Sequence, residues 1–354
     1  MSVSYGGDSI TFADSSTIAS GFTGFKNRVI NGGMDIAQRG TSFTSTSSAN
    51  NDDTYVLDRF YILSDGNDIV DVTQTTTVPT GAKYSIGLDV ETVNKKFGIA
   101  QIIENANCFD AIGGNVTVSF QAKVSATTNL DNIKCAIVAW SGTVDTVTSD
   151  IISAWGVEGT NPTLIANATY ENTPANLGVT TSFATYSVTA NVDTASTSNI
   201  ILFIWSDVTT TALGEFLYIT NVQLEKGSTA TSFDYRPYGT ELVLCERYFE
   251  KSYQIGSAPG TNGSLAGFCS TTTSTGATSE LSGIRFRTRK RDTPSITIYQ
   301  AVNGTSGQVY RVSDAASITV SAVNHIGETG IGFLQLASGS ANGYYWHYAA
   351  SIEL

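Results

Sequence analysis

The chain has 354 residues, of which 41% are hydrophobic and 14% are charged, and it includes 16 Phe, 16 Tyr and 4 Trp. Its length exceeds one ordinary hydrophobic core, and its aromatic content excludes an intrinsically disordered chain. The formal net charge is −12, with 11 basic and 23 acidic side chains before residue 239, so we expect neither nucleic-acid binding nor membrane insertion.

Residues 1–25 are small, polar and rich in turn-forming types, and the large side chains that they offer for burial are Ile10, Phe12, Ile18, Phe22 and Phe25. This is too little apolar surface for independent folding. We interpret the segment as an attachment arm that other chains order, or as a strand along a trimer axis. A frayed terminus is the alternative.

From residue 27 to residue 238, short strand patterns alternate with clusters of turn-forming residues. Val116, Val118 and Phe120, for example, alternate with polar residues, as in a strand with one buried face. The clearest such segments are 55–63, 69–78, 99–104, 115–125, 133–140, 181–190, 199–205 and 215–224. They predict a two-sheet antiparallel β-sandwich of jelly-roll type. The long connection at residues 141–176 is expected to carry a hairpin or a short helix.

The stretch from residue 218 to residue 253 is expected to close this β-sandwich and open the next domain. Residues 218–225 form the predicted last strand, with Tyr218, Thr220, Val222 and Leu224 on one face and Ile219, Asn221, Gln223 and Glu225 on the other. Thereafter the apolar residues Leu242, Cys245 and Phe249 recur at intervals of three and four, which predicts a helix from Thr240 to Ser252.

Several motifs in this chain resemble those of bacteriophage tail-fibre and receptor-binding proteins. Their linker is matched by VQLEKG at 222–227, FDYRP at 233–237 and LCERYF at 244–249. The opening of their carbohydrate-binding-module-like β-sandwich is matched by NRVINGGM at 27–34, QRGT at 38–41 and DRF at 58–60. The final residues, ASIEL at 350–354, resemble the usual C-terminus of the family.

The resemblance implies a virion protein, made in the host cytoplasm, that attaches to a host cell-surface glycan. It implies a homotrimer whose N-terminal arm binds other tail or capsid proteins. In such a trimer, Leu242, Cys245 and Phe249 would pack the linker helix near the three-fold axis. The family supplies no catalytic motif, so we expect no enzyme activity. Two alternatives remain. The first is a purely structural virion component, such as a capsid decoration or tail adaptor. The second is a short glycan-degrading spike.

Residues 256–354 predict a smaller β-domain, with strands at 282–291, 295–299, 308–312, 317–323, 332–336 and 343–353. The pairs Asn303-Gly304 and Asn342-Gly343 are strong turn signals between these strands. The predicted organisation is therefore an arm at residues 1–25, a β-sandwich at 26–238, a linker helix at 239–255 and a C-terminal β-domain at 256–354.

Four arginines lie two residues apart in this last domain, at Arg285, Arg287, Arg289 and Arg291. On a strand they would share one face, where the guanidinium groups could bind a sulfated or carboxylated glycan. The alternatives are a solvated edge strand and a ladder paired with acidic residues.

The last strand carries aromatic residues on both faces, with Tyr344, Trp346 and Tyr348 on one of them. Aromatic rings stack on the apolar faces of sugars, so these three residues are candidate receptor contacts. Packing in a core or across a trimer interface is the alternative for one of the two faces.

No cofactor or metal site is indicated by the sequence. Cys108, Cys135, Cys245 and Cys269 are widely spaced and are expected to be buried thiols. The N-terminus shows no signal-peptide pattern, so we expect folding in a reducing cytoplasm. The aspartates at residues 65, 68 and 71 leave a structural calcium ion as an alternative to a solvated turn, although their spacing is not that of an EF-hand.

Overall fold

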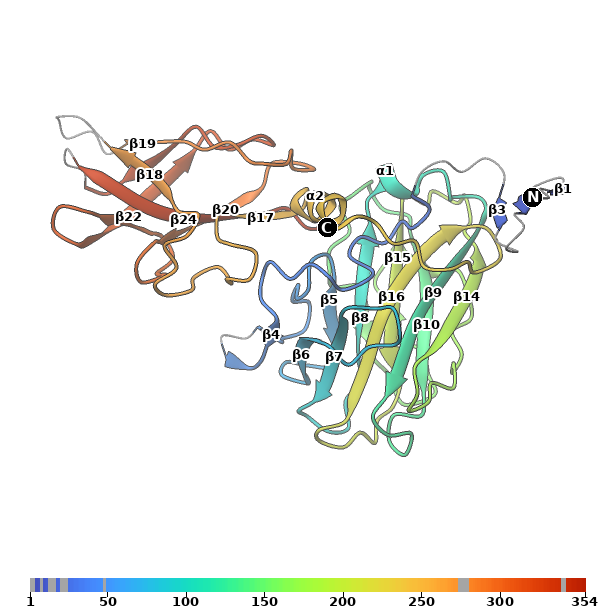
Figure 1. The fold of residues 1–354 in the computed structure, drawn as a ribbon. Coiled ribbons are helices and arrows are strands. Elements are labelled where there is room, and N and C mark those ends of the chain that lie inside the picture. The colour runs from blue at the N-terminus through green and yellow to red at the C-terminus, as the bar shows by residue number, and fades with distance from the viewer. Residues whose placement is uncertain are drawn as a thin grey trace.

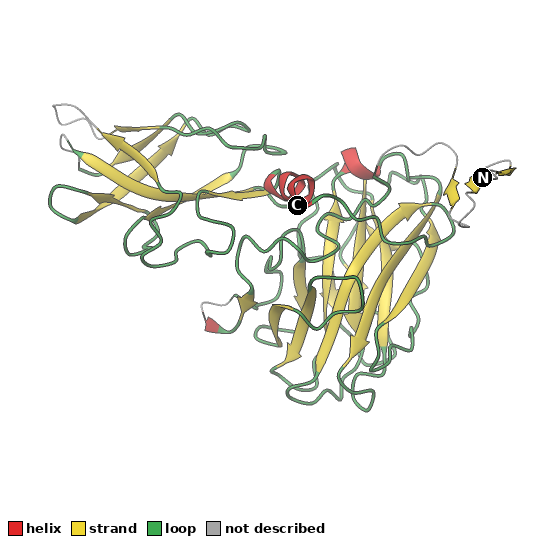
Figure 2. Cartoon of the chain, in the orientation of Figure 1, coloured by secondary structure: helices red, strands yellow, loops and turns green. Residues whose placement is uncertain are grey.

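The computed structural model describes residues 4–6, 9–11, 17–19, 25–46, 49–272, 280–338 and 342–354. Two antiparallel β assemblies lie on either side of helix α2 (Tyr238–Glu246), as Figures 1 and 2 show. This confirms the predicted all-β class with a sandwich, a short helix and a smaller C-terminal β assembly. None of the helices in the described ranges is long and apolar enough to cross a membrane.

The N-terminal arm is described at three short strands, which are β1 (Ser4–Gly6), β2 (Ser9–Thr11) and β3 (Thr17–Ala19). These strands pair in the order β1-β2-β3. The other residues of the predicted arm before Phe25 lie outside the described residues, so its attachment role stays a prediction.

The first assembly contains two large sheets. The six-stranded sheet has the order β14 (Ala184–Asn191), β9 (Asn115–Val124), β16 (Phe216–Lys226), β7 (Ser85–Val90), β6 (Val70–Thr75) and β4 (Ser42–Phe43). The five-stranded sheet has the order β13 (Ala168–Tyr170), β10 (Ile133–Trp140), β15 (Asn199–Ser206), β8 (Phe97–Ile103) and β5 (Tyr61–Ser64). All their pairings are antiparallel.

A hydrophobic core fills the space between these two sheets. Val118 and Phe120 of β9 lie in it together with Ile99 of β8 and Ile137 of β10. The alternation seen in the sequence of β9 is therefore the alternation between this core and the outer face of the six-stranded sheet.

The second face of the five-stranded sheet is also buried, which explains why β10 and β15 are apolar on both faces. Phe203 and Trp205 stack at 4.4 Å between ring centroids, and Trp155 of the 141–176 connection packs edge-on against Phe203. This connection contains a hairpin of β11 (Ile152–Ala154) and β12 (Thr163–Leu164), one of its two predicted structures. Helix α1 (Asn105–Cys108) is a single turn after β8.

The C-terminal assembly is built around β24 (Gly343–Ser351). It pairs with β17 (Phe249–Lys251), β18 (Cys269–Thr272), β20 (Ser295–Gln300) and β21 (Gln308–Arg311). The sheet continues from β21 through β22 (Ala316–Asn324) and β23 (Phe333–Leu336) to β19 (Glu280–Ser282). A separate core cluster lies within this assembly.

Three sequence predictions of secondary structure are wrong. The helix ends at Glu246, because the following residues of the predicted helix form β17 along β24. Residues 283–291 are not a strand beyond the isolated bridge between Arg285 and Gly330. Strand β7 was missed, although Ile86, Leu88 and Val90 alternate with smaller or polar residues, as in a strand with one buried face. In the first two cases pairing with a distant strand, or its absence, overrides the local pattern.

The two assemblies meet at the C-terminus of the chain, which lies beside α2 in Figure 1. The Glu353 carboxylate forms ion pairs with Arg59 and with Arg39, the latter at 2.9 Å, and both arginines belong to the first assembly. The Tyr55 hydroxyl donates to the Leu354 carbonyl oxygen at 2.6 Å. Long-range polar contacts therefore fasten the end of the chain to the β-sandwich.

Candidate functional site

The structure places the three aromatic candidates of the last strand in a core. Tyr344, Trp346 and Tyr348 are all buried within the C-terminal assembly. The Tyr348 hydroxyl also donates to Glu250 at 2.6 Å. A buried ring cannot stack on a sugar, so we withdraw these residues as receptor contacts in favour of the alternative, core packing.

The four arginines do not form a row, because their segment is not a strand. Arg287 contacts Glu246 at 3.4 Å, and Arg289 forms an ion pair with Glu328. Arg291 donates to the backbone carbonyl oxygens of residues 352 and 353. Arg285 donates a hydrogen bond to the Thr329 hydroxyl at 3.2 Å. The prediction that all four share one face is wrong.

The three residues predicted to pack a trimer helix lie in different environments. Cys245 is buried against the five-stranded sheet of its own chain, and Leu242 is half-buried beside it. Phe249 belongs to β17, and the Arg39 guanidinium lies 3.8 Å from its ring centroid. Cys245 and Phe249 thus pack within one chain, and the trimer itself stays a prediction.

The structure brings Ser252 and His347 together, a pair that no sequence motif indicates. The Ser252 hydroxyl lies 2.8 Å from Nδ1 of His347, whose Nε2 lies 2.6 Å from the Ser264 carbonyl oxygen. Both side chains are buried, and burial lowers the pKa of His347. With no surface for a substrate, this pair is a structural contact between strands.

The aspartates considered for calcium have other partners. Asp65 forms an ion pair with Lys95 at 3.2 Å. Asp68 and Asp71 both accept hydrogen bonds from the side-chain amide of Asn50. No group of three acidic, His or Cys side chains in the described part of the chain is arranged to hold a metal ion.

Asp53 lies in a second acidic turn, and its environment makes a testable prediction. Burial, followed by the charges of Asp52 and Asp150, raises its pKa to about 7. A raised pKa in the folded state gives stability that is lost as the pH rises through that value. The loss begins above the ordinary carboxyl pKa of 3.8 and is complete above about 7. We therefore expect the stability advantage of Asp53→Asn over the wild type to be larger at pH 8 than at pH 5 by about 1–2 kcal/mol, after allowance for solvent screening.

Urea denaturation at the two pH values measures this difference. The residue has φ of 62°, a conformation that asparagine tolerates as well as aspartate does. The exposed Asp131 provides a control, because Asp131→Asn should change stability little at either pH. An advantage of Asp53→Asn that is no larger at pH 8 than at pH 5 would contradict the raised pKa of the Asp53 carboxyl group.

A surface pocket of about 290 Å³ lies on the outer face of the six-stranded sheet. Its walls come from β9, β14, β16 and the segment after β16, including Gln121, Thr185, Asn221, Phe233 and Tyr235. Amides, hydroxyls and aromatic rings therefore meet in one concave surface. Such a combination suits a neutral sugar, since rings cover its apolar face and amides bond its hydroxyls.

Asn221 enters the pocket because β16 contains a bulge. The register of β16 against β9 shifts between Thr220 and Gln223, and Asn221 has φ of 51°. Its side-chain amide nitrogen donates to Gln121 Oε1 at 2.7 Å. Its Oδ1 is buried without a hydrogen-bond partner among the described residues, and the residue is 7% exposed. An unpaired buried acceptor is costly unless a ligand or water donates to it.

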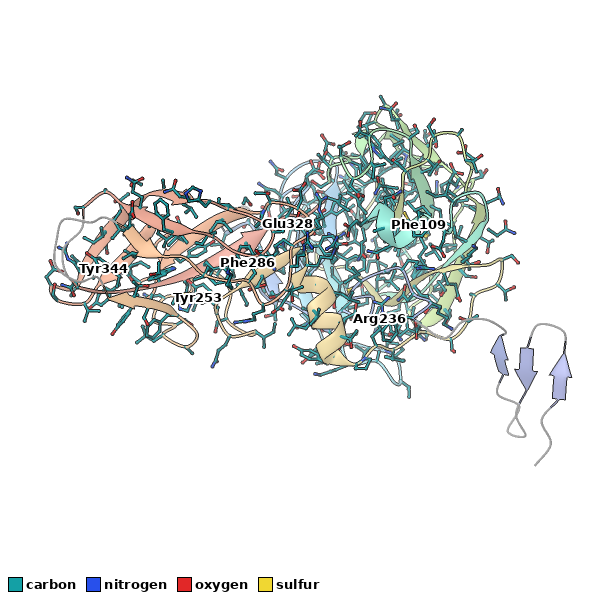
Figure 3. All side chains as sticks on the ribbon, turned by 90° about the horizontal axis from the view of Figure 1, so that it is seen from above. Phe109, Arg236, Tyr253, Phe286, Glu328 and Tyr344 are labelled. Carbon is teal, nitrogen blue, oxygen red and sulfur yellow. The ribbon has the colours of Figure 1, made fainter. Side chains whose placement is uncertain are left out.

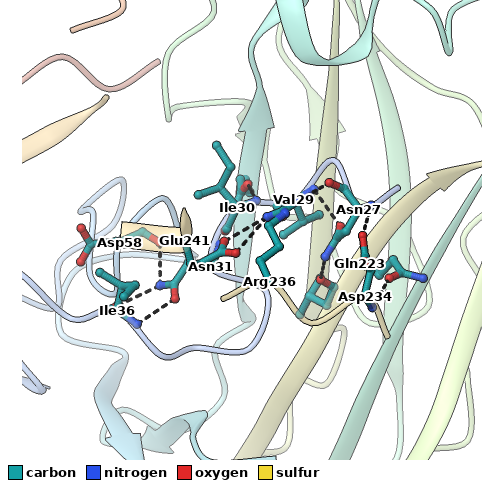
Figure 4. Close-up of polar contacts among 12 residues, drawn as sticks. Asn27, Val29, Ile30, Asn31, Ile36, Asp58, Gln223, Asp234, Arg236 and Glu241 are labelled. Carbon is teal, nitrogen blue, oxygen red and sulfur yellow. Dashed lines mark hydrogen bonds and ion pairs between the residues drawn. The ribbon is translucent and has the colours of Figure 1, made fainter. Parts of the chain in front are cut away.

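The segment that carries the two rings is fixed by polar contacts on both sides of Tyr235 (Figure 4). The Asp234 backbone N–H donates to Gln223 Oε1 at 2.8 Å, and the Asp234 carboxylate accepts the backbone N–H of Lys26 at 2.8 Å. The Arg236 guanidinium donates to Glu241 at 3.1 Å. Tyr235 itself is 55% exposed and meets the Phe233 ring edge-on at 4.7 Å.

The bulge is held by the NRVINGGM segment. The Asn27 side chain donates to the Val222 carbonyl oxygen and accepts from the Leu224 N–H. A Cβ on Gly32 would lie 2.0 Å from the same Val222 oxygen, so only glycine fits. The motifs behind the family resemblance thus shape the pocket without entering it, apart from the two rings.

Sequence reasoning missed Asn221 and Gln121. A signal existed, because the core-facing residues of β16 are Leu217 and Ile219 before the bulge and Val222 and Leu224 after it. Apolar residues move from odd to even positions, which marks an extra residue in the strand. The prediction that positions 218, 220, 222 and 224 share one face is therefore wrong.

Comparison with known proteins finds no matching family model and no match among curated proteins. Among solved structures, similarity is found to the enzymatically active domain of tailspike protein 4 of bacteriophage CBA120, with 17% identity and a TM-score of 0.33 over 57% of this chain and 21% of that chain. A xylan-binding domain from Paenibacillus barcinonensis is 11% identical, with a TM-score of 0.32 over 59% of this chain and 100% of that one.

A third similar structure is the xylanase 10B of Clostridium thermocellum, with 12% identity and a TM-score of 0.32 over 57% of this chain and 30% of that chain. This chain therefore spans about a fifth of the tailspike chain and about a third of the xylanase chain. The two sheets and their shared core define the β-sandwich fold of this chain.

Proposed function

We propose that this protein is a bacteriophage virion fibre protein that attaches to a glycan on the host surface, without catalysis. The observation that carries the proposal is the pocket on the six-stranded sheet, where the unpaired Asn221 Oδ1 lies beside the exposed Tyr235 ring. The virion assignment is supported by the sequence motifs shared with tail-fibre proteins.

The pocket would hold one neutral sugar residue. The sugar ring would stack on Tyr235 or Phe233, and one of the sugar hydroxyls would donate to Asn221 Oδ1. Gln121 and Thr185 supply further hydrogen-bonding groups at the wall. Because Asp234 and Arg236 fix the backbone on both sides of Tyr235, little ordering is required on binding.

The proposal includes a homotrimer located in the virion after synthesis in the host cytoplasm, with the arm bound to other tail or capsid proteins. Binding at a single sugar site is often near millimolar. Linking several sites raises overall avidity by about 10² to 10⁴ without a new contact. Three copies of one shallow pocket would therefore suffice for adhesion.

The test is binding of fluorescently labelled protein to intact host cells. We expect Tyr235→Ala to lower cell binding about tenfold or more, because a stacked aromatic ring is removed. Asn221→Asp tests the amide while keeping a residue that tolerates positive φ. Tyr238→Ala is the matched control, since Tyr238 is 48% exposed, three residues away, and does not line the pocket.

Equal binding by the Tyr235 and Tyr238 variants would refute the pocket as the adhesive site. No binding by the wild-type protein, even when it is clustered on beads, would favour the structural-component alternative. Soluble fragments released from host polysaccharide would favour the glycan-degrading alternative. Point variants are preferable to truncation after Tyr238, which would strip Cys245, Tyr248 and Leu354 from the face of the five-stranded sheet.

A further inference from the structure

Arg285 differs from the three other arginines of its segment. Arg287 and Arg289 have carboxylate partners, and Arg291 is held by backbone carbonyl oxygens. Arg285 forms no ion pair with any described residue, and its Nη1 donates a hydrogen bond to the Thr329 hydroxyl. In a chain with a net charge of −12, an exposed guanidinium without an acidic partner is available to an external anion.

Arg285 lines a pocket of about 380 Å³ in the C-terminal assembly. The pocket lies where residues 283–285 run beside the turn at residues 327–332, with the His325 ring and the Thr329 hydroxyl at its wall. The Gly283 N–H donates to the Gly332 carbonyl oxygen, and the Ile331 N–H donates to the Ile284 carbonyl oxygen. These backbone bonds fix the two segments against each other.

Bare backbone forms much of this pocket, and packing requires it. A Cβ on Gly283 would lie 1.9 Å from the Ile331 carbonyl oxygen, and one on Gly330 would lie 2.2 Å from the Ile284 carbonyl oxygen. Gly330 also has φ of 157°, in the region that favours glycine. The glycines let the two segments pack this closely, so the pocket wall beside the guanidinium carries few side chains.

The nearest acidic residue of the turn is already engaged. Glu328, labelled in Figure 3 on the C-terminal assembly, forms an ion pair with Arg289 through its carboxylate. Glu328 is not among the residues that line the pocket. The basic side chains at its wall are thus Arg285 and His325, and no carboxylate lines it.

We propose that the Arg285 pocket binds the carboxylate of an acidic sugar residue, of the uronate class, as a second glycan contact on the C-terminal assembly. The planar carboxylate matches the fork of N–H donors that a guanidinium presents. The Thr329 hydroxyl and the His325 ring lie where they can bond the remaining oxygen atoms. This inference rests on the proposed glycan-binding function but concerns a separate site with different chemistry.

Isothermal titration calorimetry of the full chain with a galacturonate oligosaccharide provides the test. We expect saturable binding that the methyl-esterified oligosaccharide does not show. Arg285→Gln should weaken uronate binding about tenfold or more. The affinity of Arg285→Lys should lie between those of the wild type and Arg285→Gln, because lysine retains the charge without the fork of N–H donors. Arg311→Gln is the control, since Arg311 lies on the same assembly and pairs with Asp314. Thermal unfolding verifies that each variant is folded.

The proposal would be overturned by no binding of the uronate by the wild-type chain, by equal binding by the Arg285→Gln variant, or by equal affinity for the methyl ester. Binding of a sulfated oligosaccharide in place of the uronate would also overturn the carboxylate assignment. Retained uronate binding by Tyr235→Ala would support two separate sites, so this pocket and the one on the six-stranded sheet can fail independently.

Discussion

Replacing Glu353 with alanine is expected to destabilise the folded chain by about 3–5 kcal/mol, the usual cost of leaving a buried charge unpaired. The Arg59 side chain is 1% exposed and depends on this carboxylate. Its guanidinium also donates to the Ile102 carbonyl oxygen at 2.7 Å and lies 3.7 Å from the Tyr248 ring centroid. Without Glu353, the buried Arg59 guanidinium would be left with the neutral Ile102 carbonyl oxygen and the Tyr248 ring.

Urea or thermal unfolding measures this loss. Glu328→Ala is the control, because its pair with Arg289 is exposed and is worth no more than about 1 kcal/mol. The double variant Glu353→Ala with Arg59→Met should recover part of the stability, since it removes the unpaired charge as well. Equal stabilities of the Glu353 and Glu328 variants would refute the role of this contact in fastening the C-terminus.

Replacing Glu250 with alanine should cost a similar amount, about 3–5 kcal/mol, by leaving Lys290 unpaired. Both side chains are fully buried, and Lys290 Nζ lies 2.6 Å from the carboxylate. Burial lowers the pKa of Lys290, and Glu250 opposes that shift, so the amine of the variant should lose its proton more readily. The carboxylate also accepts the backbone N–H groups of Arg287 and Thr288.

The Glu250→Ala substitution should also change uronate binding, which distinguishes it from a substitution that lowers stability alone. Because Glu250 anchors the residues directly after Phe286, we expect the Arg285 pocket to lose its shape and its uronate affinity. Binding at Tyr235, on the other assembly, should persist in protein that remains folded. Glu280→Ala is a suitable control, since Glu280 is exposed on β19. A Glu250→Ala variant with wild-type stability and uronate binding would contradict this account.

The sequence by itself determined the elements whose burial pattern is local. Strands such as β9, β10 and β15 are visible because each alternates or is continuously apolar, and burial of a strand face requires no knowledge of the partner strand. The same holds for the position of the linker and for the start of α2.

Only the tertiary structure decided how these elements are used. Residues 249–251 leave the helical pattern because β24 lies beside them, about one hundred residues later in the chain. The arginine segment is not a strand. Its arginines instead contact Glu246, Glu328 and the backbone carbonyl oxygens of residues 352 and 353. The Asn221 side chain reaches the pocket wall through a bulge in β16 that lies against β9 and the Gly32 segment.

The physical reason is that periodicity records which side of a segment avoids water, whereas a site depends on which distant groups it meets. Hydrogen-bond and ion-pair partners in this protein are often more than one hundred residues apart, as between Asn27 and Leu224 or between Arg59 and Glu353. No local pattern specifies such a partner. The fold class was therefore readable from the sequence, while both proposed binding sites required the packed chain.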